Sequence, residues 1–140
     1  APHLWDEVSL RSTHPGLVSN DEKRARTAQD LVWAKRFLND PWNDLMKDWE
    51  AQPVFNGSHR PVRDEQDYDR RQLAFELTAY SLGAQDDLRE KIASLNHPIE
   101  WVVGELDGKF TKLAQEIAQI HSRSFVRILP GIGHRPETFT

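Results

Sequence analysis

The sequence of 140 residues contains no cysteine. This absence excludes a disulfide framework, a thiolate nucleophile and a Cys-ligated zinc or iron–sulfur site. No segment approaches the roughly 20 apolar residues that a membrane helix needs, and the start "APHLWDEVSL" lacks the pattern of a signal peptide. Neither sign of charge dominates, because 18 Lys and Arg stand against 22 Asp and Glu, for a net charge of -4. We therefore expect a soluble, cytoplasmic protein that binds neither nucleic acid nor membrane.

Metal and phosphate motifs are also missing. The six histidines show neither an HExxH motif nor a pair at i, i+4 spacing, so we expect no metal site. The glycine-containing stretch "LPGIGH" at 129–134 follows an expected strand but opens no helix, which argues against a phosphate-binding loop. We expect the protein to need no cofactor.

The middle of the chain has helical periodicity. Ser19 and Glu22 have the spacing of a capping box at the start of a first helix, and Asp40 with Pro41 is typical of the start of a second. A third helix is expected to end near Gly83, and a short fourth to begin near residue 86. Three tryptophans in this region, Trp33, Trp42 and Trp49, indicate either a pocket wall or the filling of a small core.

The two ends of the chain have the pattern of strands. A short alternating run precedes the helical region, and after residue 97 the apolar run "IEWVVGELD", the periodic segment "FTKLAQEIAQI" and the run "SFVRILPG" predict a strand–helix–strand unit. Such a unit implies parallel neighbouring strands in one sheet. We expect an α/β protein with three parts: a strand segment over 1–18, a helical insertion over 19–96, and a βαβ unit over 97–140.

Polar residues follow both strands of the predicted βαβ unit. Asp107 comes after the first strand and His134 after the second, so both should lie at the same edge of the sheet. Neighbouring parallel strands are about 4.8 Å apart, which lets an Asp carboxylate reach an imidazole nitrogen. An Asp before Gly is more often a simple turn, and a His near a terminus often has no role. Together, their order favours the acid and the histidine of an α/β-hydrolase triad.

The nucleophile of such a triad is missing from the sequence. A nucleophile elbow has the pattern Gly-x-Ser-x-Gly on a tight strand-to-helix turn. Ser58 in "NGSHR" comes closest, but neither of the two positions that the pattern requires to be glycine is one, so we interpret it as a loop serine. If a triad exists, its serine lies outside these 140 residues.

Several motifs in order resemble a known family. "HPGL", "RFLNDPW", "DWEAQPVF", "SLGAQDDLR", "GELDGKF" and "PGIGH" resemble the second half of the 2-succinyl-6-hydroxy-2,4-cyclohexadiene-1-carboxylate synthases, the α/β-hydrolase-fold lyases of menaquinone biosynthesis. The resemblance covers nearly the whole chain. It implies the C-terminal part of an α/β-hydrolase fold, with parallel strands six to eight and a lid insertion of four helices. After "GIGH" the chain reads "RPETFT", where the family continues with a further His and an acidic residue.

The resemblance also implies an activity and its residues. The family eliminates pyruvate from a succinylated cyclohexene dicarboxylate with a Ser-Asp-His triad, without metal or cofactor. By motif match, Asp107 would orient the imidazole and His134 would raise the basicity of the serine. Arg26 and Trp49 would bind the polycarboxylate substrate, together with a further arginine from the stretch 60–71, since Arg binds carboxylates through paired hydrogen bonds. The motifs do not align within that stretch, and Arg63 is the candidate there. For each of these three, an ordinary position on a helix surface or in a core is the competing interpretation.

Two other functions remain open. A related hydrolase of esters or carbon–carbon bonds would use the same triad through a covalent acyl step. Alternatively, the chain is a non-catalytic truncated fragment that associates with another chain through its exposed sheet edge. The partners we expect are accordingly an N-terminal half carrying the serine, which would complete the triad, or a second copy of the chain. We predict that the isolated 140-residue chain is inactive.

Overall fold

The computed structural model describes residues 8–136, and the chain forms two compact units. The sheet unit comprises the chain up to Pro15, Pro53–His59 and the chain from Leu88 onward; the helical unit comprises Gly16–Gln52 and Arg60–Asp87. Each unit has its own hydrophobic core.

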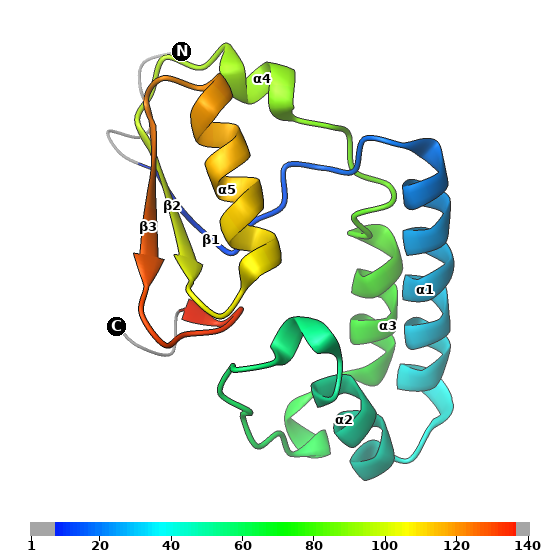
Figure 1. Cartoon of the computed structure of the whole chain (residues 1–140). Coiled ribbons are helices and arrows are strands. Elements are labelled where there is room, and N and C mark those ends of the chain that lie inside the picture. The colour runs from blue at the N-terminus through cyan, green and yellow to red at the C-terminus, as the bar shows by residue number, and fades with distance from the viewer. Residues whose placement is uncertain (1–7, 137–140) are drawn as a thin grey trace. The chain divides into compact units, whose positions relative to one another are not determined.

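A parallel sheet of three strands, in the order β1-β2-β3, forms the centre of the sheet unit. The strands are β1 (Val8–Arg11), β2 (Ile99–Gly104) and β3 (Ser124–Leu129), and α5 (Gly108–Ile120) connects the last two. The carboxyl ends of β2 and β3 point the same way (Figure 1). The predicted α/β fold with its βαβ unit is therefore confirmed.

Alternate residues of β2 build the core of the sheet unit. Trp101, only 1% exposed, and Val103 share one face of the sheet, and the apolar stripe of α5 packs on that face. The Nε1–H group of Trp101 donates to Ser124 Oγ at 3.0 Å. Buried His121 completes this network: its Nδ1 lies 2.7 Å from the same Oγ, and its Nε2 lies 3.0 Å from the carbonyl oxygen of Leu95. The buried indole N–H and both imidazole nitrogens of this network are thus paired.

The helical unit contains three α-helices, α1 (Asn20–Asn39), α2 (Trp42–Glu50) and α3 (Arg70–Ala79), and the short 3-10 helix η2 (Glu65–Asp67). The predicted capping box of Ser19 and Glu22 is present at the start of α1. α1 and α3 run side by side (Figure 1). Their apolar residues pack around fully buried Leu45 of α2. Arg70 donates to the carbonyl oxygens of Phe37 and Asp40, at 2.5 Å each, and so satisfies acceptors that the end of α1 leaves open.

The start of α2 differs from the prediction. Pro41 is its N-cap and no side chain caps the helix, whereas Asp40 is the C-cap of α1. The Asp40 carboxylate accepts from Arg36 Nε at 2.6 Å. Arg36 also donates to Asp48, and these two carboxylates raise the pKa of the guanidinium. The Asp40 carboxylate, which the sequence pattern predicted to cap α2, is therefore bound by Arg36 instead.

The bounds of the helical unit also differ from those of the expected helical insertion over 19–96. The short helix α4 (Arg89–Ala93) packs with the sheet unit, where Ile92 is part of the core and Leu88 packs against it. The segment Pro53–His59 likewise belongs to the sheet unit, through Val54. Both segments are thus held in the sheet unit by apolar contact with its core.

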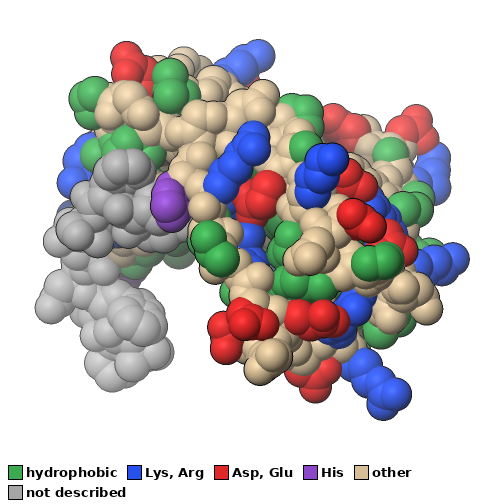
Figure 2. Space-filling view, turned by 90° about the horizontal axis from the view of Figure 1, so that it is seen from below, with side chains coloured by type: hydrophobic (Ala, Val, Ile, Leu, Met, Phe, Trp, Pro, Cys, Tyr) green, Lys and Arg blue, Asp and Glu red, His purple; other side chains and the backbone are tan. Residues whose placement is uncertain are grey.

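Charge on the surface is mixed. Figure 2 shows Lys and Arg side chains interspersed with Asp and Glu over the face in view. Among the helices of residues 8–136, none is long and apolar enough to cross a bilayer.

Candidate active site

Asp107 and His134 meet at the carboxyl edge of the sheet. His134 Nδ1 lies 2.6 Å from Asp107 Oδ2, with 6% of the Asp side chain and 20% of the His side chain exposed. The acceptor carboxylate requires the proton on Nδ1, which leaves Nε2 as the ring nitrogen for proton transfer. The predicted neighbourhood of these two residues is therefore observed.

The fold fixes the Asp107 carboxylate through a second bond. Asp107 is the N-cap of α5, and its Oδ1 accepts from the Phe110 backbone N–H at 3.3 Å. Its own backbone N–H donates to the carbonyl oxygen of Gly104, at the end of β2, at 3.0 Å. One oxygen thus caps the helix while the other holds the imidazole.

Backbone bonds tie the loop that carries His134 to the loop that carries Asp107. The backbone N–H of Glu105 donates to the carbonyl oxygen of Leu129 at 3.0 Å. The backbone N–H of Leu106 donates to the carbonyl oxygen of Ile132 at 2.9 Å. The Glu105 carboxylate accepts from the Gly131 N–H at 2.8 Å. These bonds set the separation of the acid and the histidine independently of their own contact.

Two glycines allow the close approach of these loops. A Cβ atom at Gly104 would clash with the carbonyl oxygens of Ile132 and Gly133. A Cβ atom at Gly133 would lie 2.6 Å from Ser58 Oγ. The glycines of "GELD" and "GIGH" are thus required by packing beside the Asp–His pair.

A third segment, Pro53–His59, which we call the brace segment, lies against the His134 loop. The Phe55 ring is 6.2 Å from the His134 ring, and Phe110 of α5 lies 4.4 Å away from it. Arg135 stacks over Phe55 at 3.9 Å and donates to the carbonyl oxygen of His59 at 2.8 Å. The histidine is therefore held by its neighbour in sequence as well as by Asp107.

The sequence reasoning missed the brace segment and assigned only a loop to it, through Ser58. Ser58, the loop serine of that reasoning, packs against Gly133, and its buried Oγ has no hydrogen-bond partner among the described residues. The apolar pair in "QPVF", Val54 and Phe55, was the available signal. Those residues do not reveal which unit they join.

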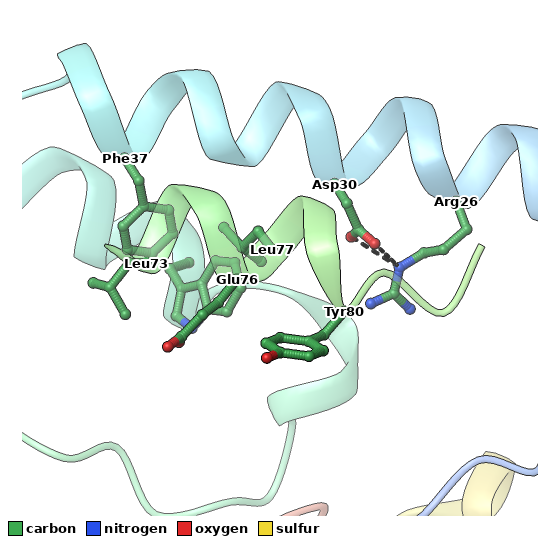
Figure 3. A pocket seen from close by; sticks show the side chains of 8 residues that line it. Arg26, Asp30, Phe37, Leu73, Glu76, Leu77 and Tyr80 are labelled. Carbon is green, nitrogen blue, oxygen red and sulfur yellow. Dashed lines mark hydrogen bonds and ion pairs between the residues drawn. The ribbon is translucent and has the colours of Figure 1, made fainter. Parts of the chain in front are cut away.

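The helical unit contains a cavity of about 360 Å³ (Figure 3). Arg26 and Trp49, both predicted to bind substrate, line this cavity together. The other lining residues are Asp30, Phe37, Leu73, Glu76, Leu77 and Tyr80. Trp49 is held by edge-to-face contacts with Trp33, at 5.0 Å, and Phe37, at 5.3 Å. Its ring therefore serves both the core and the cavity wall.

Arg26 is bound to a buried partner. Its Nε donates to both carboxylate oxygens of Asp30, at 2.8 Å each, and Asp30 is only 4% exposed. The sequence reasoning did not single out Asp30. Two signals were present: the i, i+4 spacing of Arg26 and Asp30, and the position of Asp30 one turn before Ala34 on the buried stripe of α1.

Arg63, the third predicted substrate-binding residue, does not line the cavity that Arg26 and Trp49 share. Its guanidinium forms an ion pair with Glu50, and its carbonyl oxygen accepts from Trp42 Nε1 at 3.0 Å. It borders a different depression of the same unit, beside Trp42. The guanidinium of Arg63 is thus paired with the largely buried carboxylate of Glu50.

The described residues contain no group of three or more His, Cys, Asp or Glu side chains arranged to hold a metal ion. The Asp–His pair by its own geometry can transfer protons, since the carboxylate selects the imidazole tautomer with Nε2 free to accept.

Comparison with known proteins finds relatives for most of the chain. The 2-succinyl-6-hydroxy-2,4-cyclohexadiene-1-carboxylate synthase of Salmonella newport (strain SL254) is 40% identical over 110 residues, which are 75% of this chain and 44% of that protein. The synthase of Salmonella enteritidis PT4 is 39% identical over the same shares. The chain thus spans less than half the length of these curated relatives. No family model matches it.

A solved structure has the same fold. The structure titled MenH from S. aureus superposes with a TM-score of 0.78, covering 92% of this chain and 52% of the other, at 24% identity. These comparisons confirm the resemblance that the motifs predicted, and its restriction to a C-terminal half.

Proposed function

Because the chain is homologous to part of the 2-succinyl-6-hydroxy-2,4-cyclohexadiene-1-carboxylate synthases, we propose that it supplies the acid, the histidine and the helical lid of such a lyase. The enzyme belongs to the α/β-hydrolase superfamily and serves menaquinone biosynthesis in the cytoplasm. It needs no metal or cofactor.

The hydrogen bond between His134 Nδ1 and Asp107 Oδ2, at 2.6 Å, is the observation that carries this proposal. A carboxylate in this place stabilises the imidazolium that forms when Nε2 takes a proton. The proton comes from a serine hydroxyl, which then serves as the base toward the substrate. Asp107 thus orients and charge-stabilises His134, and His134 activates the serine.

The proposed reaction is an elimination. The base takes a proton from a ring carbon of the succinylated cyclohexene dicarboxylate, and the electron pair forms the new ring double bond. The carbon–oxygen bond to the pyruvyl group breaks, and the departing enolate takes up a proton to become pyruvate. No oxidant or reductant is consumed, which agrees with a site built only from an acid, a histidine and a serine.

Substrate binding is assigned to the cavity of the helical unit. The product in the relatives' name has two carboxylates, one on the succinyl group and one on the ring. The Arg26 guanidinium can bind one of them, and the indole of Trp49 provides an apolar wall for the ring. Arg63 has no part in this proposal, since Glu50 takes its guanidinium.

The nucleophile must come from outside these residues. The 140-residue sequence contains no Gly-x-Ser-x-Gly pattern. We therefore propose that the isolated chain is inactive and that a polypeptide carrying the N-terminal half completes the triad.

Pyruvate release tests the proposal. The chain is assayed alone and mixed with an N-terminal segment of the Salmonella newport synthase, with pyruvate measured by a coupled dehydrogenase. We expect no release by the chain alone, release by the mixture, and loss of release with His134→Ala. Pyruvate release by the chain alone that His134→Ala abolishes would contradict the assignment of the nucleophile.

Two alternatives are separated by the same material. Turnover of a nitrophenyl ester without pyruvate release would favour a hydrolase with a covalent acyl step. A fragment function is favoured by β1 and β3, which are the edge strands of the three-stranded sheet in the described part of the chain. Concentration-dependent association without either activity, measured by sedimentation, would support that function.

A further inference from the structure

Asp30 is a buried carboxylate in the wall of the helical unit's cavity. It is 4% exposed, and each of its oxygens accepts from Arg26 Nε at 2.8 Å. Arg26 itself remains partly exposed, with 41% of its side chain open to solvent. The pair therefore consists of a buried carboxylate and a partly exposed guanidinium.

The pairing through Nε leaves the other guanidinium nitrogens toward the cavity. In Figure 3 the two terminal nitrogens of Arg26 extend beyond the Asp30 carboxylate, on the side where Tyr80 lies. Among hydrogen bonds between described residues, those of Arg26 come from Nε alone. A guanidinium held in this way presents a fork of N–H groups that matches a second carboxylate.

Other arginines of the helical unit are arranged differently. Arg36 uses both Nε and Nη2, on Asp40 and Asp48. Arg70 donates from all three nitrogens to carbonyl oxygens and to Glu65. These two arginines hold the helices together, whereas the contacts of Arg26 fix only its own orientation.

We propose that Asp30 is a positioning residue, which holds the Arg26 guanidinium so that Nη1 and Nη2 bind a carboxylate of the ligand. The inference deepens the proposed function and rests on it for the class of ligand. It assigns a role to a residue that touches Arg26 and not the ligand.

If Asp30 acted only through its charge, it would weaken the binding of an anionic ligand, which is the opposite of the effect proposed here. The cavity is lined by one cation, Arg26, and two carboxylates, Asp30 and Glu76, so each carboxylate repels an anionic ligand. Glu76 accepts from Gln72 at 2.9 Å, and in the described part of the chain no hydrogen bond or ion pair joins it to Arg26, so it contributes the charge without the positioning. A comparison of the two carboxylates therefore separates positioning from charge.

The test is ligand binding by Asp30→Asn and by the matched control Glu76→Gln, each of which removes one negative charge. The probe is 2-succinyl-6-hydroxy-2,4-cyclohexadiene-1-carboxylate, titrated by calorimetry into the chain. We expect Asp30→Asn to weaken binding about tenfold, as loss of a charge-assisted bond does, and Glu76→Gln to leave it equal or slightly tighter. The Nε–H proton resonance of Arg26 should move in the first variant and not in the second.

Arg26→Lys gives a second test that does not disturb Asp30. Lysine keeps the positive charge but lacks the fork, so we expect a similar loss of about tenfold. Asp30→Asn binding as tightly as Glu76→Gln, or Arg26→Lys binding like the unmodified chain, would overturn the inference while leaving the proposed function intact. Absence of binding by the unmodified chain would instead overturn the ligand class, and the inference with it.

Discussion

Substitution of Asp107 can separate the two bonds that its carboxylate makes. Asp107→Asn retains an oxygen that can accept from the Phe110 N–H, and Asn is as favourable as Asp at an N-cap. We therefore expect the free energy of unfolding to change by less than about 0.5 kcal/mol. The amide nitrogen that replaces Oδ2, however, is a donor where His134 Nδ1 needs an acceptor.

Asp107→Ala removes both bonds and gives the scale for comparison. Loss of an N-cap costs about 1 kcal/mol. The Nδ1–H group of His134 also loses its acceptor, which adds about 1 kcal/mol because the ring is only partly exposed. A total of about 2 kcal/mol should lower the melting temperature by roughly 6 °C in a protein of this size.

The assay joins thermal unfolding, followed by circular dichroism, with ¹⁵N spectra of the imidazole. In the unmodified chain the spectra should report the proton on Nδ1, and in Asp107→Asn the proton on Nε2. With the N-terminal half added, pyruvate release by the Asn variant should fall about 10⁴-fold, since this tautomer cannot accept the serine proton.

One result would refute the reasoning. If Asp107→Asn keeps the proton on Nδ1 and the original rate of pyruvate release, then the carboxylate does not select the tautomer. If it instead unfolds as easily as Asp107→Ala, then the bond to His134, and not the helix cap, carries the stability at this position.

Three further substitutions test the surroundings. Ser12 has a φ of 43° and a buried Oγ without a partner among the described residues, so Ser12→Gly should stabilise the chain by about 1 kcal/mol in thermal unfolding; a loss would contradict this. His121→Phe should cost about 2 kcal/mol in urea unfolding, because Ser124 Oγ loses its ring partner in the core. Arg135→Leu should shift the His134 ring resonances by releasing Phe55, with unchanged helicity; unchanged resonances would remove the brace segment from the site.

Local pattern was sufficient where neighbours in sequence are also neighbours in space. The capping box of Ser19 and Glu22 depends on residues three apart, and the structure contains it. The βαβ unit follows from the change of period from two to 3.6 residues and from the handedness of such connections. Because its strands are parallel, the positions of Asp107 and His134 at one edge followed as well.

Local pattern failed where two partners compete for one group. Asp40 has the sequence setting of an N-cap, but Arg36 one turn earlier takes its carboxylate. The ion pair of Arg63 with Glu50 could not be predicted, because Glu50 lies 13 residues away and contacts Arg63 only in the folded unit. The spacing of Arg26 and Asp30 was visible, but the burial of Asp30 depends on packing.

The sequence by itself determined the elements, the order of the acid and the histidine, and the family that its motifs resemble, because these depend on periodicity, spacing and residue type. Only the tertiary structure decided that the brace segment joins the sheet unit, that Arg135 stacks on Phe55, and that Arg26 is held through Nε by Asp30. Those contacts depend on which buried surfaces exclude water together and on which charged groups then find each other, and separation along the chain does not encode either.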